Sequence, residues 1–594
     1  MHSMRALGAL SALLLLSPSC TASRAPSQAG PTLPARTPSP ALSPAQVALR
    51  AFVDAHFEDS FRRFPTMATQ AGIHTYDGEL RGFTAEDRMA HLAQLKSELD
   101  ALPKQVDRAA LPPLDRADYD ILENHLRARI LDIETVRGWE RNPNTYLSTA
   151  SYSVYQLINR DFAPLDQRMR SAVSRMKEVP AVFTSAQSTL KNPPKLWTEI
   201  ALMQAVGTRA LYAETLPKAF APVKDASLQS QFQQEQARCL AAIDAYIRFL
   251  REDLLPRSQG EFPIGEQVYR QKLQYEEGVT EDIDSLLAWG HAELKRTQAQ
   301  FREVAGRITR GKAPMDVYQE LGKEHPAPAA LVDTTRATLE ELRQFVIDRN
   351  IITVPSEVRA QVAETPAFSR ALSFASISIV GPFETRATEA YYYVTPPEPT
   401  WSAEQVEQHM SFYNRYALPI VSIHEAYPGH YVQFLWTRKV DSKVRQLLGS
   451  GSFSEGWGLY TEQMMLDEGY GGGGLQGDKL RLNQLALYLQ RLARYVVGLS
   501  LHTRGMTYAQ AVSFFEQEAY MTRTNAEREA RRGTSDPTYL VYALGKKLIL
   551  QLREDAQAKW GADFTLRRFH DELVSYGYPP IPILRRLMLG EDPG

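Results

Sequence analysis

The sequence predicts a mainly α protein, a large helical bundle of two lobes with one small β-sheet. Apolar residues recur at helical intervals over most of the chain, whereas runs rich in β-branched and aromatic residues are confined to residues 351–395. A fixed-period repeat is absent from the sequence, which argues against a helical solenoid. With 594 residues, 44% hydrophobic and 23% charged, the chain has a globular composition and exceeds one ordinary core.

The N-terminus predicts export to the cell envelope. A basic start precedes an apolar run from Ala6 to Leu16, whose 11 residues are too few to span a bilayer and are typical of a signal peptide over residues 1–20. Cys20 resembles the lipid-modified cysteine of bacterial lipoproteins, with ordinary cleaved export as the alternative. Residues 21–44, rich in Pro, Ser and Ala, predict a flexible linker. We expect an outer-membrane lipoprotein or a periplasmic protein, in contact with the membrane only through that lipid.

Residues 45–278 predict the N-terminal helical lobe. Its longest amphipathic stretches cover residues 46–64, 84–102, 114–139, 197–220 and 228–254. Thr84 and Asp87 form a capping-box pattern at the start of the second stretch. Cys239 lies in an apolar helical run, so we expect a buried thiol and no intrachain disulfide. Glycines and a proline between residues 260 and 278 mark the lobe boundary.

Residues 279–594 predict the second, catalytic lobe. A helix is expected from a cap at Thr280 to Arg307. A small sheet follows it, because residues 351–354, 373–380 and 390–394 are rich in β-branched and aromatic residues and are separated by prolines. From residue 409 the pattern returns to helix, most clearly over residues 453–468, 480–504, 508–520, 539–556 and 563–576.

The stretch Ile420–Gln433 organises this lobe. It reads I-V-S-I-H-E-A-Y-P-G-H-Y-V-Q, and a His-Glu pair in such a stretch can place one imidazole on a metal ion and the adjacent carboxylate beside its water as general base. His424 and His430 are six residues apart, however, or about 240° around a regular helix. Pro428-Gly429 lies between them and can break or bulge the helix. We expect this break to bring His430 back towards His424, with Glu425 as the base.

Two carboxylates downstream extend the pattern. Glu455 and Glu462 are seven residues apart in S-E-G-W-G-L-Y-T-E, which places them on one face of a helix. Glu455 is the candidate third ligand, and three protein ligands leave a fourth position for water. Two unrelated surface histidines and a proline kink are the alternative. The coincidence of two histidines, a helix breaker and a carboxylate pair favours a metal ion, with zinc expected and neighbouring divalent ions open.

At these residues the chain resembles the family named domain of unknown function 885. Its two motifs, H-E-x-x-P-G-H-x-x-Q and E-G-W-x-x-Y-x-E, are matched without gaps at His424, Glu425, Pro428, Gly429, His430 and Gln433 and at Glu455, Gly456, Trp457, Tyr460 and Glu462. The likeness extends over most of the chain and includes residues 533–547. The family is similar to helical zinc peptidases of the gluzincin type. The resemblance implies a zincin-like fold whose small sheet lies beside the cleft, where an edge strand can pair with a substrate.

The resemblance also implies roles for single residues. It implies one zinc ion per chain, bound by His424, His430 and Glu455. Glu462 is either a further ligand or a group that orients a ligand histidine, and the second role is favoured because the family's ligand glutamate matches Glu455. Tyr542, in the late shared segment, is the candidate oxyanion donor, with a purely structural tyrosine as the alternative.

We therefore expect an exported zinc-dependent metallopeptidase-like hydrolase that cleaves short peptides by metal-activated water. Two alternatives stay open at this point. One is a non-catalytic lipoprotein whose metal braces a site for a peptide or an envelope component, and the other is a metal hydrolase of a non-peptide amide or ester. The net charge of −2 gives no reason to expect nucleic acid as a partner.

Overall fold

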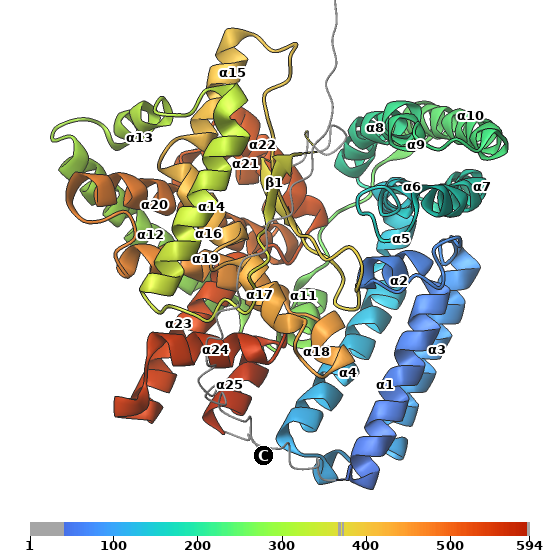
Figure 1. Ribbon diagram of the computed structural model, residues 1–594, viewed down its shortest axis with the longest axis horizontal. Helices are drawn as coiled ribbons and strands as arrows, with labels where there is room; N and C mark the ends of the chain where they lie inside the picture. The colour runs from blue at the N-terminus through green and yellow to red at the C-terminus, as the bar shows by residue number, and fades with distance from the viewer. Residues whose placement is uncertain (1–40, 366–369, 371–373, 591–594) are drawn as a thin grey trace, which may run out of the picture. The chain divides into compact units, whose positions relative to one another are not determined.

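Helices carry most of the described chain, as the sequence predicts (Figure 1). The computed structural model describes residues 41–365, 370 and 374–590. The predicted signal peptide, Cys20 and most of the predicted linker lie outside these described residues. Residues Pro44–Gly594 form one unit by their internal contacts, and its division into two lobes at residue 278 stays a prediction.

The first part of this unit is built from amphipathic helices. They are α1 (Pro44–Arg63), α2 (Pro65–Ala71), α3 (Ala85–Gln105), α4 (Pro113–Leu131), α5 (Gly138–Arg141), α6 (Asn144–Tyr155), α7 (Leu165–Thr189), α8 (Lys195–Ala210), α9 (Leu216–Phe220) and α10 (Ala226–Arg248). The predicted capping box opens α3, where the Thr84 hydroxyl accepts from the Asp87 amide and the Asp87 carboxylate accepts from the Thr84 amide.

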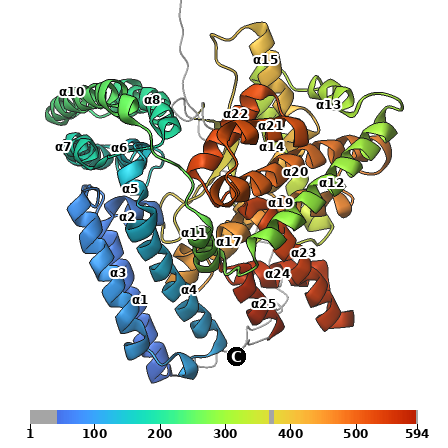
Figure 2. The same ribbon diagram turned by 180° about the vertical axis from the view of Figure 1, so that it is seen from behind.

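Two hydrophobic cores form between these helices. In one, α1, α3 and α4 lie side by side, and Val444 and Ile583 from much later in the chain join their apolar faces (Figures 1 and 2). In the other, α7 packs along α10, and the core between these helices surrounds Cys239. The Cys239 thiol is fully buried, and desolvation raises its pKa to about 12. The prediction of a buried thiol at Cys239 is confirmed.

The largest core lies between the helices that follow. They are α11 (Glu266–Lys272), α12 (Ile283–Ile308), α13 (Pro314–Gly322), α14 (Leu331–Asp348), α15 (Ala403–Met410), α16 (Ala417–Glu425), α17 (His430–Thr437), α18 (Lys443–Leu447), α19 (Gly451–Asp467), α20 (Gly474–Thr503), α21 (Tyr508–Glu518), α22 (Arg523–Ser535), α23 (Val541–Trp560), α24 (Leu566–Ser575) and α25 (Ile581–Leu589). The cap predicted at Thr280 is wrong, because the Asp282 side chain accepts from the Ser285 amide and caps α12 instead.

A three-stranded sheet is inserted before α15. Its strands are β1 (Gln361–Glu364), β2 (Ala375–Ser378) and β3 (Tyr391–Val394), in the order β1-β3-β2. The central strand β3 pairs parallel with β1 and antiparallel with β2, so that Gln361 and Ser378 both lie opposite Tyr391. Among the strands that the structure describes, this order places β1 and β2 at the two edges of the sheet.

The strand predicted at residues 351–354 is wrong, and the strand β1 forms ten residues later instead. Side chains, and not a neighbouring strand, satisfy the backbone of this segment. The carbonyl of Ile351 contacts the His570 ring, the Thr353 amide donates to Asp571, and the Thr353 carbonyl accepts from Trp436. Because these partners take the backbone groups that a sheet would need, the apolar segment is buried as a loop.

His74 joins the helix α2 region to the loop between β2 and β3. Its Nδ1 lies 2.9 Å from Asp77, its Nε2 lies 2.9 Å from Glu384, and its ring stacks on Phe162 at 4.0 Å. A neutral imidazole has only one N–H, so two carboxylates are both satisfied only by the doubly protonated ring. Burial opposes the charge, but the hydrogen bonds to both carboxylates prevail and raise the His74 pKa above 6.5.

This contact predicts a pH-dependent contribution to stability. A raised pKa in the folded state stabilises the fold fully below pH 6.5, and this stabilisation is lost as the pH rises through the raised value. His74→Gln should lower the free energy of unfolding by about 1.5–3 kcal/mol near pH 6, the range for hydrogen bonds to charged groups. Urea unfolding at a series of pH values measures this difference, which should shrink towards alkaline pH. A constant difference between the two proteins would contradict the prediction.

Candidate metal centre

The helix that carries the first motif breaks at the predicted position. The helix α16 ends at Glu425, and α17 begins at His430. Between them the chain turns through Pro428-Gly429, and the Gly429 amide donates to the Ile423 carbonyl at 3.0 Å. The two imidazoles therefore meet despite their six-residue spacing, with ring centroids 4.8 Å apart.

Close backbone packing holds this break in place. A Cβ atom at Gly429 would lie 1.8 Å from the His424 carbonyl oxygen, so only glycine fits there. The indole N–H of Trp457, on α19, donates to the Pro428 carbonyl at 2.9 Å. The second motif thus fixes the conformation of the first.

Three donor groups converge at this point. One ligand atom each from His424, His430 and Glu455 lies within 4.8 Å of the others. Glu455 Oε2 is 3.4 Å from His424 Nε2 and 3.5 Å from His430 Nε2. Tetrahedral zinc with bonds of about 2.0–2.1 Å requires donor atoms about 3.3–3.4 Å apart. The two distances from Glu455 Oε2 match this spacing, and the two imidazole nitrogens lie within 4.8 Å of each other. Two imidazoles and one carboxylate are a donor set that zinc accepts.

Glu462 contacts the outer nitrogen of His424. Its Oε1 lies 2.8 Å from His424 Nδ1, which leaves Nε2 turned towards the other donors. A carboxylate on the outer nitrogen fixes the orientation of a ligand histidine. Burial disfavours charge on His424, yet hydrogen bonds to Glu455 and Glu462 raise its pKa to about 10. Burial likewise opposes the charge of Glu455, but hydrogen bonds to the two imidazoles hold its pKa well below the usual range.

Glu425 lies between the donor group and the edge strand. Its Oε2 accepts a hydrogen bond from the Ile377 amide of β2 at 3.0 Å. Burial raises the pKa of Glu425, and the charge of Glu455 adds to this rise, while His424 and His430 oppose it. A carboxylate with a raised pKa beside a metal site is suited to accept and return a proton.

Tyr542 lies on α23 beside two arginines. Its hydroxyl is 3.4 Å from an Arg532 nitrogen, and the Arg494 guanidinium lies 5.0 Å from its ring centroid. Arg494 is itself held by Glu529 through two hydrogen bonds of 2.6 and 2.9 Å. Burial raises the Tyr542 pKa and the charge of Glu455 raises it further, so the hydroxyl keeps its proton. The charge of Glu455 therefore acts on the Tyr542 hydroxyl, which stays protonated and can donate a hydrogen bond.

A comparison with protein families identifies the family to which these two motifs point. The model of the family described as bacterial protein of unknown function (DUF885) matches residues 65–588. The chain belongs to this family. None of the curated proteins matches it.

Two solved structures resemble this member of the family. A protein from Shewanella oneidensis, assigned as a lipoprotein of unknown function, is 30% identical, with a TM-score of 0.76 over 91% of this chain and 99% of that one. A protein from Colwellia psychrerythraea, also assigned as a lipoprotein, is 18% identical and shares the fold, with a TM-score of 0.77 over 93% and 99% of the chains. Within residues 41–365, 370 and 374–590, none of the helices combines the length and apolarity that a membrane crossing requires.

Sequence reasoning missed one residue that shapes the site of this family member. A Cβ atom at Gly458 would lie 2.7–2.8 Å from three atoms of the His424 ring, so the ring packs directly on the backbone of α19. The segment Gly456-Trp457-Gly458 places two glycines inside a helix. Each glycine costs a helix roughly 1 kcal/mol relative to alanine, so such a pair signals a close approach.

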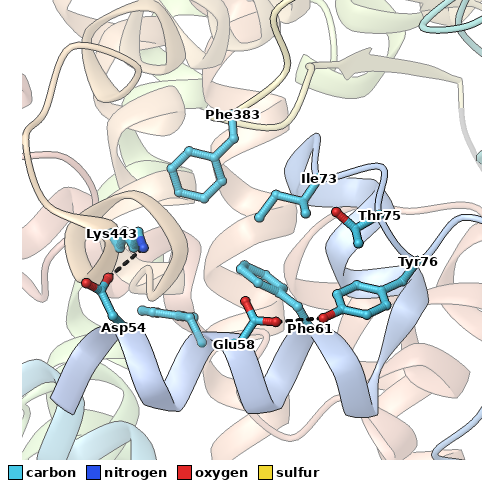
Figure 3. A pocket seen from close by; sticks show the side chains of 9 residues that line it. Asp54, Glu58, Phe61, Ile73, Thr75, Tyr76, Phe383 and Lys443 are labelled. Carbon is cyan, nitrogen blue, oxygen red and sulfur yellow. Dashed lines mark hydrogen bonds and ion pairs between the residues drawn. The ribbon is translucent and has the colours of Figure 1, made fainter. Parts of the chain in front are cut away.

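A surface pocket elsewhere in the chain shares no residue with the donor group. It has a volume of about 180 Å³ and is lined by residues of α1, of the segment after α2, and by Phe383 and Lys443 (Figure 3). Its polar groups pair with each other, Asp54 with Lys443 at 2.6 Å and Glu58 with the Tyr76 hydroxyl at 2.6 Å. The pocket therefore offers no comparable set of converging ligands.

Proposed function

We propose that the chain is an exported zinc-dependent hydrolase that cleaves peptide bonds of short peptides. The observation that carries this proposal is the convergence of His424, His430 and Glu455, whose ligand atoms all lie within 4.8 Å of one another, with Glu425 beside them. Three protein donors leave the fourth position open, which is typical of catalytic and not of structural zinc sites.

Each residue of the site has a part in the proposed reaction. Zinc bound by the three donors would polarise a substrate carbonyl and lower the pKa of water towards about 7. Glu425 accepts the proton of the attacking water and passes it to the leaving amine. Tyr542 keeps its proton and donates a hydrogen bond to the oxyanion that develops. Glu462 holds His424 in the orientation that directs Nε2 to the ion.

The position of β2 supports a peptide as the substrate. This strand is at the edge of its sheet, and its Ile377 amide contacts the Glu425 carboxylate. An extended peptide can add to the edge of a sheet through main-chain hydrogen bonds, which an ester without a peptide backbone cannot copy. A peptide paired with β2 would lie beside the proposed base.

The N-terminal segment supports an envelope location. Cys20 follows an apolar run that is too short to span a bilayer, and the two solved relatives are assigned as lipoproteins. A lipid on Cys20 would anchor the enzyme at the membrane surface, with the linker as its tether.

Zinc content tests the proposal directly. The purified chain, measured by elemental mass spectrometry, should hold about one zinc ion. His430→Ala removes a donor and should weaken zinc binding by far more than about 100-fold, the upper end of the range for outer partners of a ligand. His291→Ala is the matched control, since His291 is an exposed histidine on α12 away from the donor group. The same preparations are then incubated with a mixed peptide library and the products identified by mass spectrometry.

The outcomes separate the candidate functions. Zinc in the unmodified chain and in His291→Ala, together with cleavage of peptides by both, supports the peptidase. Zinc without cleavage of any peptide would favour the metal-braced binding protein, and cleavage restricted to non-peptide amides or esters would favour the third class. A chain that binds no zinc after the ion is added back would overturn the proposal.

A further inference from the structure

Two arginines on one face of α22 link the proposed site to the start of the edge strand. Arg528 and Arg532 are four residues apart, so their side chains project from the same side of the helix. An Arg532 nitrogen lies 3.4 Å from the Tyr542 hydroxyl, and the Arg528 guanidinium lies 5.7 Å from the ring centroid of Phe374. This face of α22 therefore extends from the proposed oxyanion donor to Phe374.

Phe374 directly precedes the strand β2. Its carbonyl accepts from the Thr395 amide, on the side of β3, whereas the Ile377 amide donates to Glu425 on the opposite side of the strand. Three residues of extended chain separate Phe374 from Ile377, which is about 10 Å at 3.3 Å per residue. The contact of Arg528 with Phe374 is thus about 10 Å along β2 from the residue that binds the proposed base.

Arg528 adds positive charge to a group of paired arginines. Arg494 pairs with Glu529 at 2.6 Å, and Arg532 pairs with an aspartate on its own helix at 3.1 Å. Arg528 is exposed, yet the surrounding chain partly desolvates its guanidinium and lowers its pKa. The charges of Arg494 and Arg532 lower this pKa further, and only Glu529 opposes them among the charges that act most strongly. A carboxylate beside Arg528 would relieve this repulsion.

We propose that Arg528 binds the C-terminal carboxylate of the substrate. This inference rests on the proposed peptidase function and names its substrate class, peptides with a free C-terminus close to the bond that is cut. A guanidinium offers a carboxylate two parallel N–H donors, and its planar fork matches the carboxylate geometry.

The position of Arg528 also sets the direction of the bound peptide. A peptide with its scissile bond at Glu425 and its C-terminus at Phe374 runs antiparallel to β2, because β2 continues from Phe374 towards Ser378. The parallel direction would place an N-terminal ammonium beside Arg528, where like charges repel. About 10 Å of extended chain holds two or three residues. Water therefore adds across an amide bond near the C-terminus, and a dipeptide or tripeptide that keeps the terminal carboxylate is released.

Peptide binding tests the inference without hydrolysis. The probe is a pool of random pentapeptides with a fluorophore at the N-terminus, prepared with a free C-terminal carboxylate and with a C-terminal amide. Glu425→Gln is the background, so that the probe is not consumed, and fluorescence anisotropy gives Kd. The acid form should bind about 10- to 100-fold more tightly than the amide, as expected for hydrogen bonds between charged groups, and Arg528→Gln should remove this difference. Equal Kd values for both forms, a preference that survives in Arg528→Gln, or no binding of either form would overturn the inference.

Arg523→Gln is the matched control on the same helix. Arg523 is five residues before Arg528, about 140° around the helix, and pairs with Glu516 and Glu527. Its substitution should leave the preference for the acid form unchanged. If Arg528→Gln does not fold, Arg528→Lys takes its place, since lysine keeps the charge without the two parallel donors and should lose part of the preference.

Cleavage products separate this inference from the proposed function. The unmodified chain is incubated with one peptide library in two forms, with free and with amidated C-termini. It should release dipeptides or tripeptides from the free C-termini and cut the amidated peptides about 10- to 100-fold more slowly. Equal rates on both forms, or cuts far from the C-terminus, would overturn the inference and leave the peptidase intact. A chain that cuts neither form would contradict the proposed function, and peptide binding alone then decides the role of Arg528.

Discussion

Glu425→Gln should lower peptide hydrolysis by about 10²- to 10⁴-fold while zinc remains bound, because the substitution removes a general base and no ligand. Glutamine has the size of glutamate, and its carbonyl oxygen can still accept from the Ile377 amide. The edge strand and the donor group should therefore keep their places. The two effects are measured as the hydrolysis rate of a library peptide that the unmodified chain cleaves and as the zinc content of the same preparation.

A surface glutamate provides the control for this substitution. Glu404 is exposed in the first turn of α15, and Glu404→Gln should leave both hydrolysis and zinc content unchanged. Full activity of Glu425→Gln would show that another group takes the proton. Loss of zinc together with activity would instead make Glu425 a ligand, in conflict with the three-donor site.

The break that brings His430 to His424 could be predicted because its causes are local. A six-residue spacing is incompatible with a continuous helix, and Pro428-Gly429 is a pair that ends helices. The contact that stabilises this break could not be predicted from the local sequence. The Trp457 indole that holds the Pro428 carbonyl is 29 residues further along the chain, and local patterns say nothing of such contacts.

For the small sheet, the approximate location could be predicted from the sequence, but the residues that form its first strand could not. Residues 351–354 have the composition of a strand, but His570, Asp571 and Trp436 take their backbone groups. The strand β1, Gln361–Glu364, has a less typical composition and gains its place from the pairing with β3. Composition thus located the sheet between residues 351 and 395, while distant partners decided which segments entered it.

The backbone contact between α19 and α23 lies beyond the reach of the sequence for a similar reason. Gly456 and Gly545 are 89 positions apart, and no local period links them. Their close approach is visible only in the packed helices. Glycines inside helices are the one feature of the sequence that points to this contact and to the position of the His424 ring.

Gly458→Ala tests whether the backbone of α19 positions His424. The added Cβ atom would lie 2.7–2.8 Å from Cε1, Nδ1 and Nε2 of the ring, closer than such contacts occur, so the ring must move. The movement would break the 2.8 Å contact of Nδ1 with Glu462 and displace Nε2 from Glu455. Since a donor and its orienting bond are both disturbed, zinc binding should weaken by more than about 100-fold.

Gly306→Ala separates this effect from the general effect of alanine in a helix. Gly306 lies within α12, and a Cβ atom there meets nothing within 4 Å. Alanine at such a position should raise the free energy of unfolding by about 0.5–1 kcal/mol and leave zinc affinity unchanged. Alanine at position 458 favours the helix as much as alanine at position 306 does. We therefore expect the metal-free Gly458→Ala chain to stay folded when it no longer binds zinc. Equal zinc affinities of the two variants in a chelator titration would show that the His424 ring does not depend on the close approach of α19.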